Sequence, residues 1–350
     1  MPFSSPGLQS GAACDKVAPG LKAKMGRHNI KDLTLGQSLR ELYLVKSKRK
    51  STTKQGKTYL DLELQDKTGI IKAKVWDDAD RADQECRRGD VIKVEAVVEE
   101  FNRALQLKVK RLRRAEPEEA DLAELLPATE KDPGAMLQGL RERIAAVQNP
   151  HLHQLLDLFF ADHDFVEKLS VSAAARNLHH GFRGGLLEHI YAMVRIADWL
   201  VENIYPALDR DLVLAGTILH DVGKITELNS DLEISYTREG FLQGHISLGL
   251  MMIHGQARTL PDFPPELLLH LEHIVLSHHG EHEWGSPVLP ATPEAMLIHH
   301  VDNLDAKTTM VLEAIKSDKN LDEEFTEYHR ALERHFYKVR PAAVEGTDEG

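Results

Sequence analysis

The sequence predicts a multidomain α+β protein in which a small five-stranded β-barrel precedes an all-α domain. Apolar and polar residues alternate between about residues 36 and 114, which is the period of half-buried strands. From about residue 134 to 340, apolar residues recur every three to four positions, as in helices that bury one face. The charge changes as well: residues 38–115 carry 20 Lys and Arg against 13 Asp and Glu, whereas residues 134–350 carry 17 against 33. A basic module is therefore joined to an acidic one.

The composition of the 350-residue chain is that of an ordinary soluble protein, with 42% hydrophobic and 28% charged residues. No apolar run approaches the roughly 20 residues needed to cross a bilayer, and the N-terminus is too polar for a secretory signal. The two cysteines, Cys14 and Cys86, exclude a disulfide framework. Neither a P-loop nor a GxGxxG motif occurs, so nucleotide-driven motors and dinucleotide redox enzymes are unsupported. We expect a cytoplasmic protein with no membrane partner.

The predicted strands are short and separated by turn signals. QDKTG at residues 65–69 and RRGD at residues 87–90 are two such turns. Five strands in so short a segment suit a closed or nearly closed barrel, because closure leaves no exposed edge. The strands are expected at residues 38–46, 59–64, 69–76, 90–100 and 104–109.

Changes in composition give the expected domain boundaries. Residues 1–30 begin with a segment rich in Gly, Ser, Pro and Ala and are interpreted as a flexible tail. Residues 116–135 are acidic and contain prolines, which is typical of a linker. The barrel is therefore expected over residues 31–115 and the helical domain over residues 136–340, followed by a tail at residues 341–350.

Histidine and aspartate residues gather on otherwise apolar faces of the predicted helices. Burying an imidazole or a carboxylate is costly unless it is paired, and a divalent cation compensates several such groups at once. A lone histidine of this kind is more often a hydrogen-bonded core residue, but an ordered set favours a metal site. Mixed nitrogen and oxygen donors suit Mn, Fe, Zn or Mg. The set comprises His189, His220, Asp221, His245, His278, His279 and Asp302.

These motifs resemble the HD-domain metal-dependent phosphohydrolases, an all-helical superfamily named after its adjacent His-Asp pair. Five segments resemble one branch more closely, the bacterial 3′–5′ exoribonucleases of YhaM type, which join an N-terminal OB-fold to a C-terminal HD domain. The resemblance covers about residues 30–320 and includes the domain order. The segments are GGLLEHIYAMV, LAGTILHDVGKI, GHISLG, LSHHGEHEWGSP and HHVDNLDAK.

The resemblance implies two metal sites that share the carboxylate of Asp221. The implied ligands of the principal ion are His189, His220, Asp221 and Asp302. Those of the second ion are His245, His278 and His279, although some of these histidines could contact phosphate instead. Manganese is the expected metal, with Mg²⁺, Fe²⁺, Co²⁺ and Zn²⁺ as alternatives. Such ions activate water and neutralise phosphoryl charge, so that no serine or cysteine nucleophile is needed.

Further residues are candidates for the catalytic site, together with Asp221. Lys224 in HDVGK could neutralise a phosphate oxygen, or it could be a cation at a helix C-terminus, where the helix dipole favours it. His179, His180 and Arg183 precede the first ligand helix. The resemblance implies that these three residues meet the scissile phosphate or the 3′ end.

The basic residues of the barrel are predicted to bind a nucleic-acid strand. The segment 46–57 (KSKRKSTTKQGK) holds six Lys and Arg and no acid, and it joins the first two predicted strands. In OB-folds, strands 2 and 3 and the loops beside them bind single strands, with aromatic rings stacking on bases and cations following phosphates. The alternative is a solvated hairpin with Trp76 capping the barrel core. The expected contacts are Lys46, Lys48, Arg49, Lys50, Tyr59, Lys72, Lys74, Trp76 and Phe101.

The predicted activity is that of a metal-dependent 3′–5′ exoribonuclease that hydrolyses single-stranded RNA, and single-stranded DNA as a second candidate, to nucleoside monophosphates. Residue chemistry supports metal-dependent phosphoester hydrolysis beside a single-strand binder, whereas polarity and RNA preference come from the resemblance. One alternative is an HD phosphohydrolase acting on free nucleotides or cyclic dinucleotides, which the absence of Gly-Tyr-Pro after His279 disfavours. Another is a single-strand-binding protein with an inactive HD site. A homo-oligomer is suggested only by analogy.

Overall fold

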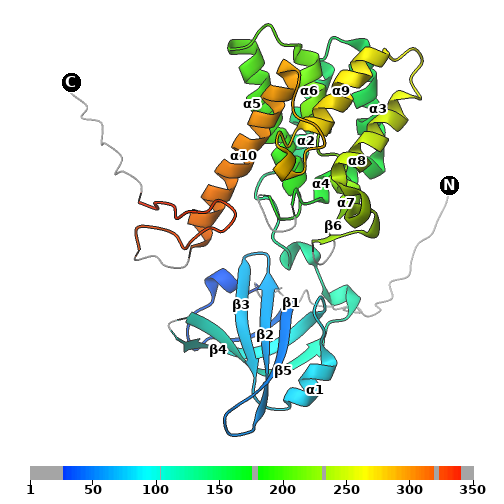
Figure 1. Ribbon diagram of the computed structural model, residues 1–350. Coiled ribbons are helices and arrows are strands. Elements are labelled where there is room, and N and C mark those ends of the chain that lie inside the picture. The colour runs from blue at the N-terminus through cyan, green and yellow to red at the C-terminus, as the bar shows by residue number, and fades with distance from the viewer. Residues whose placement is uncertain (1–26, 103, 176–179, 231–233, 319–322, 340–350) are drawn as a thin grey trace, which may run out of the picture.

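The structure is a computed structural model that describes residues 27–102, 104–175, 180–230, 234–318 and 323–339. Within these residues a β-barrel is followed by a body made almost entirely of helices (Figure 1). This architecture confirms the predicted fold class.

The barrel closes in the order β1-β2-β3-β5-β4. Its pairs are antiparallel except for β3 and β5, which run parallel. Alternate side chains such as Leu60, Leu62 and Leu64 point inward and are buried, as the period of two requires. The strands are β1 (Ser38–Thr52), β2 (Thr58–Asp66), β3 (Gly69–Val75), β4 (Val91–Phe101) and β5 (Ala104–Arg114).

The first strand corrects the expected loop at residues 46–57. β1 continues to Thr52 and pairs with β2 up to the register Thr52↔Thr58, so the connecting turn is only Thr53–Lys57. The polar residues at 46–52 suggested a loop. They lie in a part of the hairpin that extends past the apolar core, where a strand needs no apolar face. Two further elements accompany the barrel: η1 (Ile30–Asp32) and α1 (Ala79–Glu85), a short helix between β3 and β4 that buries Ala79 and Ala82.

The acidic segment between the domains is bonded to both of them. It contains the 3₁₀ helices η2 (Pro117–Glu119) and η3 (Leu122–Glu124). The Gln65 side chain of the barrel donates to the carbonyl of buried Leu125 at 3.2 Å. Further along, the amide of Thr129 donates to the carbonyl of Arg183 at 2.9 Å, at the entrance of the helical domain. The segment therefore has fixed contacts at each end.

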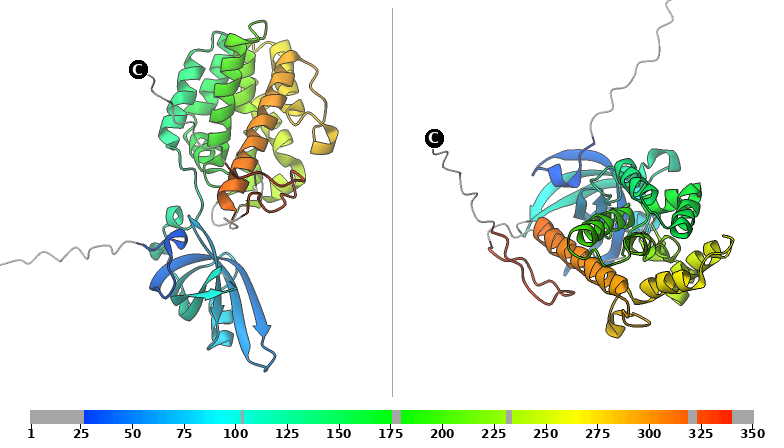
Figure 2. Two further views of the ribbon diagram at one scale, coloured as in Figure 1. Left: turned by 90° about the vertical axis from the view of Figure 1, so that its left-hand side faces the viewer. Right: turned by 90° about the horizontal axis from the view of Figure 1, so that it is seen from above.

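The helical domain packs around one apolar core (Figures 1 and 2). In the centre of this core, α6 approaches its neighbouring helices closely at Gly216. A Cβ at this position would lie 2.9 Å from the side chains of Ile274 and Ile298. Among the described residues, no helix has the length and apolar character needed to cross a membrane. The helices are α2 (Pro133–Ala145), α3 (Pro150–Ala161), α4 (His163–Val171), α5 (Gly185–Asn203), α6 (Arg210–Leu219), α7 (Lys224–Glu227), α8 (Arg238–Ala257), α9 (Pro265–Ser277), η4 (His282–Trp284) and α10 (Pro293–Ser317). A small sheet pairs β6 (Leu228–Asn229) with β7 (Ser235–Tyr236).

Candidate metal centre and nucleic-acid interface

The structure brings together all seven residues of the predicted metal set. They come from α5, the turn after α6, α8, the end of α9 and α10. In α8, Gly244 adopts φ 70° and ψ 157° and interrupts the helix, so that His245 begins a new helical segment next to the site. In chain order the seven residues are His189, His220, Asp221, His245, His278, His279 and Asp302.

Asp221 lies at the centre of this cluster and is 1% exposed. Its Oδ1 is 3.5 Å from Nε2 of His245 and 3.5 Å from Nε2 of His278. Its Oδ2 is 3.4 Å from Nε2 of His220 and 3.8 Å from Nε2 of His189. The two carboxylate oxygens thus face different pairs of imidazoles, which is the arrangement that a bridging ligand requires.

Backbone carbonyls orient two of the imidazoles. Nδ1 of His220 donates to the carbonyl of Thr217 at 2.8 Å, and Nδ1 of His278 donates to that of Val275 at 2.7 Å. A carbonyl only accepts, so Nδ1 carries the proton and Nε2 presents a lone pair. Within the described residues these Nε2 atoms, and Oδ1 of Asp221, are buried without a hydrogen-bond partner. Orphaned acceptors are costly, and a divalent cation satisfies them, so the donor set fits a metal.

A second carboxylate orients His189, which is fully buried. Its Nδ1 donates to Oδ2 of Asp305 at 2.7 Å, and its Nε2 faces Oδ1 of Asp302 at 3.3 Å. Burial opposes the imidazolium, but hydrogen bonds to these two aspartates outweigh burial and raise the pKa of His189 to about 9. A proton and a metal ion would therefore compete for Nε2. Asp305 was not predicted, although its i+3 spacing from Asp302 places both on one helix face.

The donor atoms form groups whose members lie within 4.8 Å of one another. One group joins His189, His220 and Asp221, and another joins His245, His278 and His279. These two groups coincide with the ligand sets implied for two ions, with Asp302 adjoining the first. A third group joins His180, His189 and Asp305. Burial and then the neighbouring His278 lower the pKa of His279 to about 4, so this imidazole is neutral, as a metal ligand must be.

Lys224 contacts the metal centre directly. Its Nζ donates to Oδ2 of Asp221 at 2.6 Å, and the residue is 9% exposed. It is the first residue of the four-residue helix α7 and also lies in its last turn, so the alternative role as a cation near a helix C-terminus stays open beside the contact to Asp221. Burial opposes its charge, but Asp221 outweighs burial and the pKa of Lys224 is raised. A protonated ammonium group is therefore held beside the cluster.

Of the other candidates for phosphate contact, His180 is related to the centre by its side-chain contacts. His180 is 2% exposed and its Nε2 lies 3.1 Å from Oδ2 of Asp305, which places it behind His189. Arg183 pairs through its backbone with the linker, its amide donating to the carbonyl of Pro127 at 3.0 Å. His179 lies outside the described residues.

Replacing Asp305 with asparagine is expected to weaken metal binding by roughly 10- to 100-fold, because carboxylates behind metal-ligating histidines set their orientation and basicity. Calorimetric titration with Mn²⁺ measures this loss. Glu272→Gln is the matched control, since its carboxylate bonds Nδ1 of His254 at 2.8 Å away from the cluster. Equal affinities for Mn²⁺ in the two variants would contradict the role of Asp305.

Aromatic rings and a lysine share the outer face of β2 and β3. The rings of Tyr59 and Trp76 stack with centroids 4.8 Å apart, and Trp76 is not among the side chains that pack in the described barrel core. Nζ of Lys74 lies 4.7 Å from the centre of the Tyr59 ring, 5.5 Å from that of Trp76 and 5.8 Å from that of Phe101. A groove of about 750 Å³ runs here, and Arg49 and Lys72 line it with Lys74 and Phe101. This combination suits a single strand.

Two predicted contacts lie on the other side of the same hairpin, because successive side chains of a strand alternate. Lys48 bonds the carbonyl of Asp83 at 2.7 Å and its carboxylate at 2.7 Å. Lys50 pairs with Asp80, also on α1. The structure therefore does not bring these lysines together with the aromatic face. Lys46 lies at the bulge in β1.

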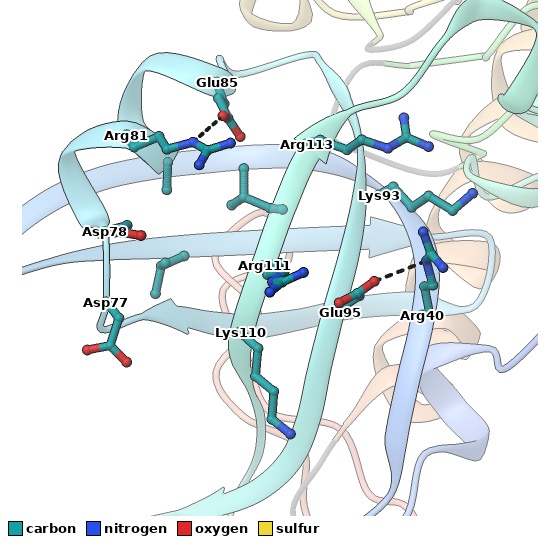
Figure 3. Close-up of a pocket in the computed structure, with 13 residues that line it drawn as sticks. Arg40, Asp77, Asp78, Arg81, Glu85, Lys93, Glu95, Lys110, Arg111 and Arg113 are labelled. Atoms are coloured by element: carbon teal, nitrogen blue, oxygen red, sulfur yellow. Dashed lines mark hydrogen bonds and ion pairs between the residues drawn. The ribbon is translucent and has the colours of Figure 1, made fainter.

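A second hollow, of about 440 Å³, lies between α1 and strands β1, β4 and β5 (Figure 3). Carboxylates are interleaved with its cations: Arg40 pairs with Glu95 at 3.2 Å and Arg81 with Glu85 at 2.7 Å. The described residues that line it include no aromatic ring. The β2–β3 face also contains a paired cation, since Lys74 lies 3.1 Å from Asp61, but it adds aromatic rings. Without such stacking platforms, the side at α1 is less suited to a single strand.

Comparisons with known proteins agree with both domains. The HD domain family matches residues 186–307, and the OB-fold nucleic acid binding domain family matches residues 44–115. The 3′–5′ exoribonuclease YhaM of Geobacillus sp. (strain WCH70) is 38% identical over 321 residues, which span 90% of this chain and 96% of that protein. Among solved structures, the second OB-fold domain of replication protein A from Methanococcus maripaludis is 26% identical, covers 25% of this chain and 94% of its own, and gives a TM-score of 0.22. The chain therefore belongs to the family of the 3′–5′ exoribonuclease YhaM.

Proposed function

We propose that this protein is a metal-dependent 3′–5′ exoribonuclease that hydrolyses single-stranded RNA to nucleoside monophosphates, with single-stranded DNA as a second candidate substrate. The observation that carries the proposal is Asp221, a buried carboxylate that faces the Nε2 atoms of four imidazoles. An OB-type barrel with a stacked aromatic face on the same chain supports a nucleic-acid substrate. The name of the Geobacillus relative supports the polarity and the preference for RNA.

The HD domain is metal-dependent, and we propose two divalent ions, with Mn²⁺ as the first choice. Bound there, such ions supply a hydroxide near neutral pH and neutralise phosphoryl charge. The proposed ligands are His189, His220, Asp221 and Asp302 for one ion, with Asp221 shared by a second ion held by His245, His278 and His279. Asp305 holds His189 in the orientation that points Nε2 toward the cluster.

Lys224 is the proposed contact to a phosphate oxygen. Its ammonium group is buried beside Asp221 and is kept protonated by that carboxylate, so it supplies a fixed positive charge without reorganisation. The position of His180 supports a positioning role instead, because it contacts Asp305, the same carboxylate that bonds His189. Arg183 remains a proposed contact to the strand near the first ligand helix.

One assay separates this function from its alternatives. 5′-labelled single-stranded RNA, single-stranded DNA and a duplex are incubated with the protein and Mn²⁺ or EDTA. A ladder that shortens from the 3′ end, only with metal, is the expected result. Intact oligonucleotide with hydrolysis of free or cyclic nucleotides would favour the nucleotide phosphohydrolase. Binding without turnover in any metal would favour the inactive binding protein. Light scattering on the same samples tests for the homo-oligomer.

Replacing Lys72 on the outer face of β3 with alanine is expected to weaken the binding of a nucleic-acid strand. The slope of log affinity against log salt concentration should become shallower by about 0.7 to 1, because one phosphate contact is lost. Fluorescence anisotropy of labelled RNA in EDTA measures binding without hydrolysis. Lys50→Ala is the control, because Lys50 pairs with Asp80 on the opposite side. The same slope change in both variants would contradict the assignment of the β2–β3 face.

A further inference from the structure

A pocket of about 540 Å³ lies between Trp284, α10 and residues 331–336. None of its residues was assigned a role from the sequence. The residues that matter to its chemistry are Trp284, Asn303, Lys307, Arg334 and Phe336. The pocket thus combines aromatic rings with two cations, an amide and one carboxylate, that of Glu333.

This pocket is built directly onto the metal centre. The carbonyl of Trp284 accepts a hydrogen bond from Nδ1 of His279 at 2.9 Å, so the segment that carries the indole also orients a proposed ligand. On the other wall, Asn303 follows Asp302 on α10, and Lys307 lies one turn further along the same helix face. The pocket is therefore lined by residues next to Asp302 in the chain and by the residue whose carbonyl orients His279.

The chemistry at Trp284 repeats that of the barrel face. The indole belongs to a residue that is 49% exposed, and Nζ of Lys307 lies 4.9 Å from its ring centre. On the barrel, Lys74 lies over Tyr59 and Trp76 in the same way. A nucleobase stacks on an exposed ring more strongly than a solvated lysine does, and the displaced ammonium can then meet a phosphate.

The pocket is also on the side from which a strand would arrive. The C-terminal half of α10 and residues 323–339 lie at the end of the helical domain that faces the barrel (Figures 1 and 2). Asn303, Lys307 and Met310 are successive turns of α10 on that side of Asp302. A strand that ran from the barrel to Asp302 along this part of α10 would pass the pocket.

We propose that Trp284 and Lys307 form a nucleotide-binding subsite in which a base near the 3′ end stacks on the indole while the ammonium contacts its phosphate. This inference rests on the proposed exoribonuclease function. Trp284 and Lys307 position the terminal segment of the strand, whereas the proposed metal ligands serve the hydrolysis itself.

Kinetics give the first test. Trp284→Ala is expected to raise KM for single-stranded RNA by roughly tenfold, with kcat for RNA and hydrolysis of bis(p-nitrophenyl) phosphate unchanged. Trp284→Phe keeps a stacking surface and should restore most of the affinity. Trp199→Ala is the matched control, since Trp199 on α5 is similarly exposed, at 56%. An unchanged KM in Trp284→Ala would overturn the proposal, and so would an equal loss on the small ester, which indicates damage to His279.

Binding gives a test that does not depend on hydrolysis. Because the chain has three Trp residues, the double variant Trp76→Phe, Trp199→Phe leaves Trp284 as its sole indole. Adenosine 5′-monophosphate should quench its fluorescence saturably, with weaker affinity after Lys307→Gln. Quenching in the double variant, together with failure of the unmodified protein to degrade RNA, would leave the subsite standing and remove the exoribonuclease proposal. RNA degradation by the unmodified protein without quenching in the double variant would remove the subsite alone.

Discussion

Asp221→Ala is expected to lower the rate of RNA hydrolysis by on the order of a thousandfold, because metal stabilisation of phosphoryl charge contributes several kcal/mol to such reactions. The carboxylate is the one group within 3.8 Å of His189, His220, His245 and His278 alike among the described residues. Its removal separates the two halves of the cluster. Metal content after dialysis should fall in parallel with the rate.

Two companion variants separate chemistry from folding. Asp221→Asn keeps the side-chain volume beside buried Lys224 but removes the negative charge, so it should lose activity while melting cooperatively. Glu239→Ala removes a carboxylate that is 57% exposed on α8 and should retain full activity. A rate for Asp221→Asn within tenfold of the unmodified protein, with its metal retained, would rule out the central role of Asp221.

Gly223→Ala is expected to lower both stability and activity, even though its φ of −61° is open to any residue. A Cβ at this position would lie 2.0 Å from the carbonyl oxygen of His245 and 2.6 Å from the amide of Gly249. Backbone atoms cannot rotate away, so α8 must shift and carry His245 from Asp221. Overpacking of this kind costs about 1–3 kcal/mol, which corresponds to a fall in Tm of roughly 3–10 °C for a domain of this size. Hydrolysis should fall at least tenfold.

Gly255→Ala provides the matched control for this second change. Gly255 lies in the same helix α8, and a Cβ there meets nothing within 4 Å. Alanine at an open helical position is favoured over glycine by up to about 1 kcal/mol, so this variant should melt slightly higher with normal activity. If Gly223→Ala and Gly255→Ala had the same Tm, the close contact between Gly223 and α8 would not contribute to the stability of the fold.

The sequence predicted the barrel and the metal cluster for the same reason: each leaves a regular pattern. Strand alternation needs only apolar residues at every second position, and the cluster placed costly polar groups on apolar helix faces. Asp305 leaves no such pattern, because a carboxylate in a charged helix resembles a surface residue until its bond to His189 is seen. The helix α1 was missed because its only buried residues are Ala79 and Ala82.

The basic hairpin shows where sequence reasoning stopped short. Six cations in one segment indicate a site for a polyanion, but the face on which each lies depends on whether the segment is a loop or a strand. Because β1 continues to Thr52, Arg49 faces the groove while Lys48 and Lys50 face α1. The pocket at Trp284 could not be predicted either, since its walls come from segments distant in the chain.

The bonded segment between the two domains is expected to limit how far the barrel and the helical domain can separate. Leu125 is fastened to the barrel through Gln65, and Thr129 is fastened to the helical domain through Arg183. We therefore expect the distance between the aromatic face and the candidate metal centre to vary little. A long strand should engage both, and a remnant too short to reach the barrel should be degraded more slowly, which the lengths of the end products in a time course would measure.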